Sequence, residues 1–360
     1  MKRKEVYDMS IPMRTIPGYV NSKPGVQVGT KLVATGEGGE YTPEDFKHLR
    51  QMGVEWVMVD GPVGLPDARV YKELRKRVEG EGLKIYRLSN HAYHNMDVIT
   101  LNLPGRDQKL KEYLMYIRAL GEAGIYYSTY AHMGNGIWRS GETRPIRGGD
   151  MGHGVDLESP ELMGRWFSQK YVSPYSHGRE YSEQELWDNY EYFIRRVAPV
   201  AEDSGVYIGI HPDDPPVYTL GGVPRKIFGT FEGYKRALEM ADSRNIGVCL
   251  CCGCWLEGGE KMGADVYEAA EYFAKQGKLF KLHVRNVTCP MYEKGGFAET
   301  YPNDGYGDTV RIIRILQENG FDGCVMNDHL PPMVGGWRAC ESYQTAYLQG
   351  VVDAVRGRSE

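Results

Sequence analysis

The feature that most constrains the fold is a regular alternation of short β-rich runs with longer amphipathic segments along the 360-residue chain. Runs rich in β-branched and aromatic residues are typical of strands, and apolar residues at helical spacing predict helices. Strands are predicted at residues 26–32, 54–60, 83–89, 125–131, 206–211, 246–251, 278–284 and 322–328. Helices are predicted at 43–52, 67–81, 107–122, 183–203, 230–243, 264–276, 308–319 and 339–355. This α/β pattern predicts a (β/α)8 barrel, with a doubly wound open sheet as the alternative.

Signals at the ends of the predicted helices support these boundaries. Thr42 and Ser182 each precede a predicted helix with carboxylates in its first turn, which favours N-capping and suits the helix dipole. Glycine at the end of a helix commonly adopts the left-handed conformation that ends it. Glycines at such positions are Gly53, Gly82, Gly124, Gly205 and Gly320.

Two connections in the predicted barrel are unusually long. Length alone would allow two domains, but the alternation predicts a single barrel domain over residues 1–360. The segments 132–181 and 285–307 follow the fourth and seventh strands, are rich in glycine and aromatic residues, and show no obvious secondary structure. Both would lie at the C-terminal ends of the strands, where barrel enzymes have their active sites. We expect these insertions to bind substrate.

Composition argues against several classes of protein. The chain has 43 basic and 48 acidic side chains, a net charge of −5, and no long block of like charges, so neither nucleic acid nor a membrane surface is expected as a partner. No apolar run is long enough for a transmembrane helix or a signal peptide. The glycine-rich stretches lack a nucleotide-binding pattern. We expect a cytoplasmic protein, which we also expect to be a homo-oligomer.

The ends of the last four predicted strands carry His211, Cys251, His283 and Asp328. Taken singly, each has a structural explanation, as a hydrogen-bonded rim histidine, a buried cysteine or a turn-forming aspartate. Their equivalent positions on consecutive strands favour a shared metal site at one rim of the barrel. Two imidazoles, a thiolate and a carboxylate suit Mn²⁺, Fe²⁺, Co²⁺ or Zn²⁺, whereas Mg²⁺ and Ca²⁺ prefer oxygen ligands.

The cysteines also cluster around this position. Of the seven cysteines, Cys249, Cys251, Cys252 and Cys254 are nearly consecutive, which is poor geometry for a disulfide framework. We expect Cys251 to be the metal ligand and its neighbours to pack around it.

Other polar residues are candidates for substrate binding or catalysis, each with a structural alternative. Asp213 follows the first proposed ligand in a proline-flanked turn, where it would either form the turn or bind substrate hydroxyls. Arg225 and Arg285 are either structural or bind a carboxylate with two parallel hydrogen bonds. Glu299 is a solvated or a catalytic acid of the seventh loop.

Aromatic and imidazole side chains gather near the ends of the third and fourth strands. Such rings offer a flat apolar face and a polar atom to a polyhydroxylated ligand, although half or more of them would simply be core. They are His91, Tyr93, His94, Tyr130, His132, Trp138, Tyr175 and His177. We take His132 and Trp138 as candidates for binding a sugar-type substrate.

The run HPDDPPVYTLGGVPR at 211–225 resembles the central signature of the mannonate dehydratases, in which HPDDPP is followed by Gly-Leu-Pro-Arg. Cys251-Cys252-Gly253 resembles the family's Cys-Thr-Gly, His283-Val284-Arg285 its His-Leu-Arg, and Asp328-His329 its Asp-His. The resemblance is strong from about residue 187 to 330. It implies a xylose isomerase-like barrel whose Mn²⁺ or Fe²⁺ is held by His211, Cys251, His283 and Asp328. It also implies a hydro-lyase of hexuronate breakdown that converts D-mannonate into 2-keto-3-deoxy-D-gluconate.

The resemblance further implies how the reaction proceeds. The metal stabilises the enolate-like charge that forms when the proton α to the carboxylate is removed, and an acid protonates the departing hydroxyl. Candidates for that acid are Asp328 and His329, with a tyrosine from Tyr343 or Tyr347 near the family's tyrosine. Glu299 matches a carboxylate that the family keeps.

Two departures from the family pattern predict an altered substrate pocket. Phe297-Ala298-Glu299 stands where the family has Phe-His-Glu, and Met326-Asn327 stands where it has Arg-Pro. The first alternative function is therefore a metal-dependent sugar isomerase or epimerase of the xylose isomerase-like type. A non-catalytic sugar-binding barrel with a structural metal is the second.

Overall fold

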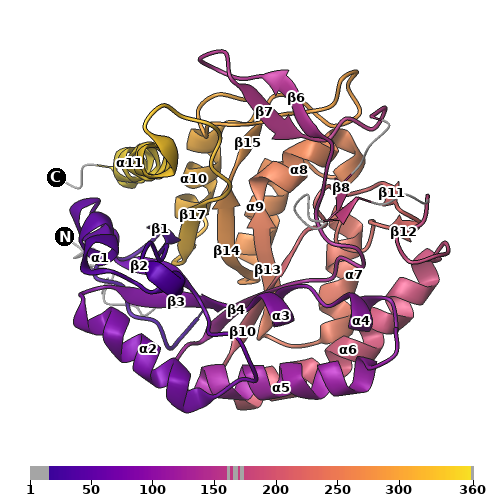
Figure 1. Cartoon of the computed structure of the whole chain (residues 1–360), viewed down its shortest axis with the longest axis horizontal. Helices are drawn as coiled ribbons and strands as arrows, with labels where there is room; N and C mark the ends of the chain where they lie inside the picture. The colour runs from indigo at the N-terminus through magenta and orange to yellow at the C-terminus, as the bar shows by residue number, and fades with distance from the viewer. Residues whose placement is uncertain (1–15, 160–162, 165–168, 171–173, 358–360) are drawn as a thin grey trace, which may run out of the picture.

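The computed structural model describes residues 16–159, 163–164, 169–170 and 174–357. Parallel strands form its central sheet: β1 (Gln27–Lys31), β2 (Trp56–Asp60), β3 (Lys84–Ser89), β4 (Tyr127–Ala131), β10 (Tyr207–His211), β13 (Ile246–Cys251), β14 (Leu279–Val284) and β17 (Cys324–Asn327). They are ordered β3-β2-β1-β17-β14-β13-β10-β4, with the helices outside them (Figure 1). The two end strands meet at Tyr116, whose hydroxyl donates to Leu88 O in β3 and lies 3.3 Å from Ser128 Oγ in β4. The predicted eight-stranded barrel is confirmed.

The helices that cover the barrel lie where the apolar spacing predicted them. They are α1 (Pro43–Gln51), α2 (Ala68–Gly80), α5 (Arg106–Glu122), α6 (Glu183–Asp203), α7 (Phe231–Ala241), α9 (Val266–Lys275), α10 (Thr309–Glu318) and α11 (Gly336–Arg356). Shorter helical segments are η1 (Glu37–Gly39), α3 (His91–His94), α4 (Asp97–Thr100), α8 (Cys252–Gly258) and η2 (Gly259–Met262). Thr42 and Ser182 form the predicted N-caps, each completed by a carboxylate that accepts from the cap's own backbone N–H. The five predicted C-terminal glycines all have positive φ.

The N-terminal half of the barrel interior is closed by a cluster of large side chains. Its buried members are Ile16, Tyr19, Trp56, Tyr86, Tyr127, Phe280, Cys324 and Met326. Two of the hydroxyls are satisfied within the cluster, because Tyr19 donates to Tyr86 O and Tyr86 donates to Phe280 O. Buried aromatic groups of this size exclude water and rigidify the strands that they join. Any central cavity must therefore lie towards the C-terminal ends of the strands.

Two irregularities in strand pairing shape the middle of the barrel. The register shifts between Val57 and Met58 where β2 pairs with β3, and between Val248 and Cys249 where β13 pairs with β14. A β-bulge breaks the alternation of side chains, so two successive residues can face the same side. Tyr86 and Phe280 accordingly belong to the inner cluster, and the residues that follow them, Arg87 and Lys281, line the cavity above it.

The long connections after β4 and β14 contain short antiparallel pairs rather than the featureless loops predicted. The first holds β5 (Trp138–Arg139), β6 (Gly141–Pro145), β7 (Met151–Gly154), β8 (Met163–Gly164) and β9 (Gln169–Lys170); the second holds β15 (Asn286–Val287) and β16 (Glu299–Thr300). A small pair, β11 (Thr219–Leu220) with β12 (Val223–Pro224), follows β10. Strands of two residues leave too little alternation in the sequence to be predicted, and the longer β6 and β7, with sequences GETRP and MGHG, have few β-branched or aromatic residues. Residues 160–162, 165–168 and 171–173 of the first predicted insertion lie outside the described residues.

The two insertions pack against each other above the rim, where Figure 1 shows β6 and β7 close to β15. Thr143 Oγ1 donates to Phe297 O at 2.5 Å, and Arg144 Nε donates to Gly296 O at 2.5 Å. Their expected role in substrate binding stays a prediction. Within the described residues, no helix combines the length and apolar character needed to cross a membrane. The cytoplasmic location and the homo-oligomeric state stay predictions.

Candidate metal centre

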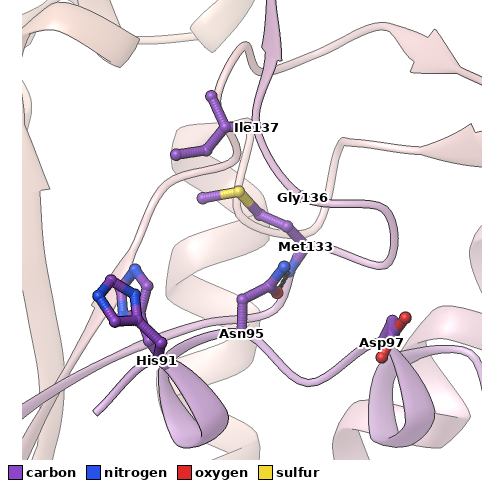
Figure 2. Close-up of a pocket in the computed structure, with 7 residues that line it drawn as sticks. His91, Asn95, Asp97, Met133, Gly136 and Ile137 are labelled. Atoms are coloured by element: carbon purple, nitrogen blue, oxygen red, sulfur yellow. Dashed lines mark hydrogen bonds between the residues drawn. The ribbon is translucent and has the colours of Figure 1, made fainter. Parts of the chain in front are cut away.

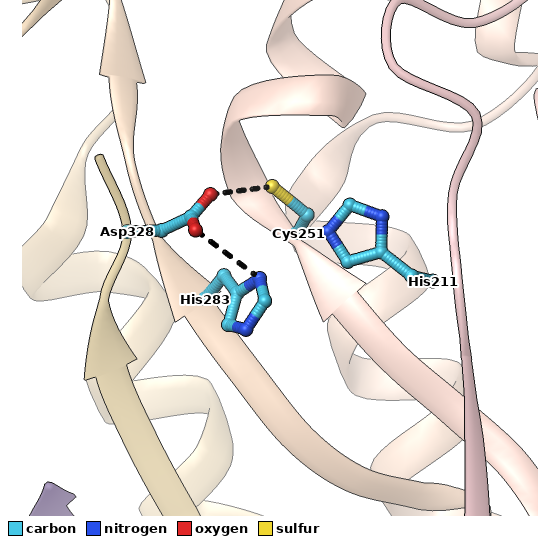
Figure 3. Close-up of side chains that lie close together, drawn as sticks. All are labelled: His211, Cys251, His283 and Asp328. Carbon is cyan, nitrogen blue, oxygen red and sulfur yellow. Dashed lines mark hydrogen bonds and ion pairs between the residues drawn. The ribbon is translucent and has the colours of Figure 1, made fainter. Parts of the chain in front are cut away.

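The four proposed ligands meet at the C-terminal rim of the barrel (Figure 3). His211 and Cys251 end β10 and β13, His283 is the last residue but one of β14, and Asp328 directly follows β17. One ligand atom from each lies within 4.8 Å of the others. Asp328 joins two of its neighbours, with Oδ2 3.5 Å from Cys251 Sγ and Oδ1 3.7 Å from His283 Nδ1. Strand order alone brings together residues separated by more than a hundred positions.

The donor atoms of this cluster are suited to a divalent transition metal. His211 Nδ1 lies 2.7 Å from Pro212 O, and a proton donated there leaves the Nε2 lone pair free for a ligand. His283 Nδ1 is buried and makes no hydrogen bond to any described residue. A buried polar atom without a hydrogen bond is costly, and this one points towards Asp328 and the other donors. The residues therefore fit the metal that the sequence predicted.

Electrostatics favour the ionised, metal-binding forms of the thiol and the carboxyl group in this cluster. Burial alone would raise the pKa of Cys251, but a hydrogen bond with Cys254 and the charge of Arg285 bring that pKa well below its usual value. Burial would likewise raise the pKa of Asp328, yet the neighbouring His329, His283 and Arg285 lower it strongly. A thiolate and a carboxylate are thus available at neutral pH.

A cavity of about 330 Å³ opens beside the cluster and extends into the barrel. Its polar lining includes Arg87, His211, Asp214, Lys281, His283, Asp328, His329 and Glu341. A neighbouring cavity of about 350 Å³ shares four of its lining residues (Figure 2). The shared residues are His91, His94, Met133 and Ile137. The two together form a polar space with apolar patches, as a small polyhydroxylated ligand requires.

Behind the cluster lies a buried network of two arginines and three carboxylates. Arg139 contacts Asp214 at 2.6 Å and Glu299 at 2.5 Å. Arg285 contacts Glu257 at 2.8 Å and both Asp214 and Glu299 at 3.1 Å. Arg139 and Glu257 were not predicted as site residues, because no local motif marks partners that lie far apart in the sequence. The two guanidinium groups compensate the charges of Asp214 and Glu299, and burial raises the pKa of Glu257 well above its usual value. These side chains therefore form an ion-pair network.

His329 connects this network to the cavity. Its Nδ1 lies 2.8 Å from Glu299 Oε1, and its Nε2 lies 4.0 Å from Asp328 Oδ1. His329 has a φ of 54°, a conformation that residues with side chains seldom adopt and that clusters at functional sites. Burial would raise the pKa of Glu299, but His329, Arg139 and Arg285 lower it to about 2. Glu299 therefore remains an ionised acceptor beside the imidazole.

The two arginines predicted to bind a substrate carboxylate already have protein partners. Arg225 donates through Nε to Pro215 O at 2.7 Å and through Nη1 to Asn135 Oδ1 at 2.7 Å. Its Nη2 donates to Gly136 O and Asp214 O, each at 2.8 Å. Arg285 serves the ion-pair network. These contacts favour a positioning role for both arginines over direct contact with substrate.

The other predicted substrate residues lie near the cavity but are not among the described residues that line it. His132 is buried among aromatic rings, its Nδ1 is 2.6 Å from Tyr130 Oη, and burial lowers its pKa to about 3. Trp138 lies in β5, where its backbone N–H donates to Asp214 O at 3.1 Å. Asp213 is buried, and desolvation raises its pKa to about 6. Contact of these three with substrate stays a prediction.

Tyr343 also lies outside the described lining of the cavity. Its hydroxyl donates to Asn303 Oδ1 at 2.7 Å and accepts from Arg147 Nη2 at 3.0 Å. Its predicted catalytic role stays a prediction. Sequence reasoning also missed two residues that do line the cavity, Arg87 and Lys281. Lys281 could have been noticed as a charged residue inside the apolar run KLFKLHV, two positions before a ligand.

Comparison with known proteins first defines the class. The structure of an L-ribulose 3-epimerase matches this chain with a TM-score of 0.59 and 13% identity, covering 93% of this chain and 99% of the other. At that identity the match shows the fold alone, the (β/α)8 barrel.

The family follows from closer matches. A family model described as D-mannonate dehydratase matches residues 168–359. A mannonate dehydratase from Streptococcus suis is 32% identical over 308 residues, which cover 80% of this chain and 81% of the relative. The crystal structure of mannonate dehydratase from Streptococcus suis serotype 2 matches with a TM-score of 0.77 and 26% identity, covering 92% of this chain and 94% of that one. The chain belongs to the D-mannonate dehydratase family, as the motifs predicted.

Proposed function

We propose that this protein is a metal-dependent hydro-lyase that removes water from D-mannonate or a related aldonate, forming 2-keto-3-deoxy-D-gluconate or the corresponding acid. The observation that carries the proposal is the convergence of His211, Cys251, His283 and Asp328 beside a cavity with many charged and polar side chains in its lining. Membership in the D-mannonate dehydratase family supports the choice of reaction.

The four converging residues would hold the metal. Mn²⁺ or Fe²⁺ is proposed, and the same nitrogen, sulfur and oxygen donors also accept Co²⁺ or Zn²⁺. When bound, such an ion supplies the positive charge that stabilises an enolate formed next to the substrate carboxylate. Asp328 is assigned to the ligand set rather than to proton transfer, because its low pKa keeps it ionised.

Proton transfer is assigned to His329. His329 Nδ1 lies 2.8 Å from both Glu299 Oε1 and Arg285 Nη1. We assign the tautomer that donates Nδ1–H to Glu299, which leaves Nε2 as the basic nitrogen on the side of Asp328 and the cavity. That nitrogen accepts the proton from C2 of the aldonate, and the C–H electron pair is held as an enolate with the carboxylate. The pair then forms the C2–C3 double bond as the C3–O bond breaks, the protonated imidazole gives its proton to the departing hydroxyl as water, and the enol product becomes the 2-keto acid.

The ion-pair network supports this role of His329. Arg139 and Arg285 keep Glu299 ionised at neutral pH, so its carboxylate continues to accept the Nδ1 proton. Both arginines are almost completely enclosed, with side chains 1% exposed, and are held by Asp214 as well. A fixed acceptor of this kind orients the imidazole without a reorganisation during the reaction.

The direct test is incubation of metal-loaded protein with D-mannonate, followed by a colorimetric assay for 2-keto-3-deoxy acids. The expected result is product in equal amount to the D-mannonate consumed. Absence of product with Mn²⁺, Fe²⁺ and Co²⁺ alike would contradict the D-mannonate assignment.

Sugar isomerisation or epimerisation is the second candidate. It is favoured by the wall of the cavity at Met326 and Asn327, where the family pattern has an arginine and a proline. Ala298, in place of the family's histidine, is buried against Tyr301 and Cys340 instead of facing the cavity. In the same incubation, an isomer or epimer formed without loss of water would support this candidate over the lyase. If the protein binds metal but turns over no sugar or sugar acid, the result would support the remaining alternative, a non-catalytic sugar-binding barrel.

A further inference from the structure

Two buried cations meet at the bottom of the central cavity. Arg87 comes from β3 and Lys281 from β14, strands that lie on opposite sides of the barrel. Lys281 is 0% exposed and Arg87 is 5% exposed. Lys281 precedes the ligand His283 by two positions on the same strand, so it lies one layer deeper in the barrel than the candidate metal centre.

Neither cation has an acidic partner among the described residues. Lys281 Nζ and Arg87 Nε make no hydrogen bond to the described part of the chain. The other Arg87 nitrogens contact neutral atoms, Met58 Sδ at 3.2 Å and His94 Nδ1 at 3.1 Å. The carboxylate that acts on Lys281 most strongly is that of Asp328, which is engaged by His283 and Arg285.

One other group near Lys281 can carry negative charge. Burial would raise the pKa of Cys249, but His283 and Lys281 lower it to about 6, and its Sγ lies 3.8 Å from His283 Nε2. A single thiolate shared with His283 does not compensate both Lys281 and Arg87, and buried cations without full compensation are strongly destabilising. Two buried cations of this kind are expected where a negatively charged ligand binds between them.

The backbone independently directs both side chains into the cavity. Each follows the extra residue of a β-bulge, Tyr86 before Arg87 and Phe280 before Lys281. Without the bulges, strict alternation would turn one member of each pair away from the barrel interior. Matching bulges on opposite strands thus place two aromatic rings as a floor and two cations above it.

We propose that Arg87 and Lys281 form an anion subsite that binds the carboxylate of the sugar-acid substrate at the bottom of the cavity. The proposal rests on the proposed function and adds the orientation of the substrate. The charged end enters first and lies beneath the candidate metal centre, while the hydroxyl-bearing chain extends towards His91 and Met133 at the mouth. The subsite selects sugar acids over uncharged sugars, because only an anion compensates the buried charges.

The subsite is tested by calorimetric binding of D-mannonate and of D-mannitol, an uncharged polyol with the same number of carbons. Wild type is expected to bind D-mannonate at least tenfold more tightly than D-mannitol. Lys281→Met is expected to lose this preference with unchanged metal content, and Lys281→Arg to retain most of it. Lys275→Met removes an exposed lysine paired with Glu271 on α9 and should behave as wild type. Retention of the preference in Lys281→Met would overturn the proposal.

Formate, the smallest carboxylate, separates failure of the subsite from failure of the proposed function. In low-salt buffer, formate is expected to raise the melting temperature of wild type and of Lys275→Met but not of Lys281→Met. This result together with no turnover of D-mannonate would keep the subsite and contradict only the substrate assignment. No stabilisation of wild type by formate would overturn the subsite. If Lys281→Met fails to fold, Arg87→Gln takes its place, with the same loss of response expected.

Discussion

Glu299 Oε1 lies 2.8 Å from His329 Nδ1, which joins a long-loop carboxylate to an imidazole that follows the last barrel strand. This contact lies on the side of the imidazole that faces the ion-pair network, and Nε2 lies on the side of Asp328. It also links the buried arginines to the proposed site of proton transfer. The account of the reaction therefore depends on a pair of residues that lie 30 positions apart in the sequence.

Removing the Glu299 carboxylate is expected to slow turnover without loss of metal. Glu299→Gln should lower kcat by about 10²-fold, within the range typical of general acid–base catalysis, and His329→Ala by at least as much. Steady-state kinetics with parallel elemental analysis provide the measurement. Glu293→Gln alters an exposed acid of the same loop and serves as the control. Full activity of Glu299→Gln would remove Glu299 from the mechanism.

The metal content of the purified protein tests the candidate metal centre without any measurement of turnover. Cys251→Ser and His283→Ala should each reduce the metal content of the purified protein severalfold or more, because each loses one of four donors. Cys252→Ser is the matched control, since Cys252 packs in the apolar core beside Cys251. Elemental analysis of the three variants beside wild type decides the point. Unchanged metal in both ligand variants would refute the site.

Arg225 distinguishes a positioning role from substrate contact. Arg225→Met leaves several buried carbonyl groups without a donor and is expected to lower the free energy of unfolding by roughly 3 kcal/mol or more. The control Arg195→Met removes an exposed ion pair with Glu191 and should change the free energy of unfolding by less than about 0.5 kcal/mol. Denaturant unfolding provides the measurement. A raised KM with unchanged stability would instead restore Arg225 as a substrate-binding residue.

His132 predicts a pH dependence of stability. Burial lowers its pKa from 6.5 to about 3, so the folded protein resists protonation of this residue while the unfolded chain does not. The stabilising contribution is complete above pH 6.5 and is lost progressively as the pH falls towards 3, by about 1.4 kcal/mol per unit over most of that range. The free energy of unfolding should therefore decrease less between pH 7 and pH 5 in His132→Gln than in wild type. Equal losses would contradict the burial of a neutral imidazole.

Most of the fold and the convergence of the four proposed ligands were predictable from local pattern. Strands and helices follow from periodicity, and the end of a parallel strand is a position that sequence alone defines. His211 and Asp328, for example, were predicted to meet because each ends a strand of one barrel. Glycine and capping signals fixed the helix ends for the same local reason.

The residues that surround the ligands were not predictable in this way. The contact of Arg139 with Glu299 spans 160 positions and depends on how two insertions fold over the rim. Arg87 and Lys281 face the cavity because of β-bulges, which strict alternation does not reveal. Arg225 carries a charge that suggests a ligand, yet its contacts show that backbone carbonyls occupy its donors.

The central claim is that this site dehydrates an aldonate with a bound metal, and a single NMR time course tests it most directly. Metal-depleted protein is mixed with D-mannonate, and Mn²⁺ is added partway through the recording. No change is expected before the addition, and afterwards the D-mannonate C3 proton signal should be lost while a C3 methylene signal grows. Growth of that signal before any metal is added, or its absence after Mn²⁺ and then Fe²⁺ and Co²⁺ are supplied, would contradict the account.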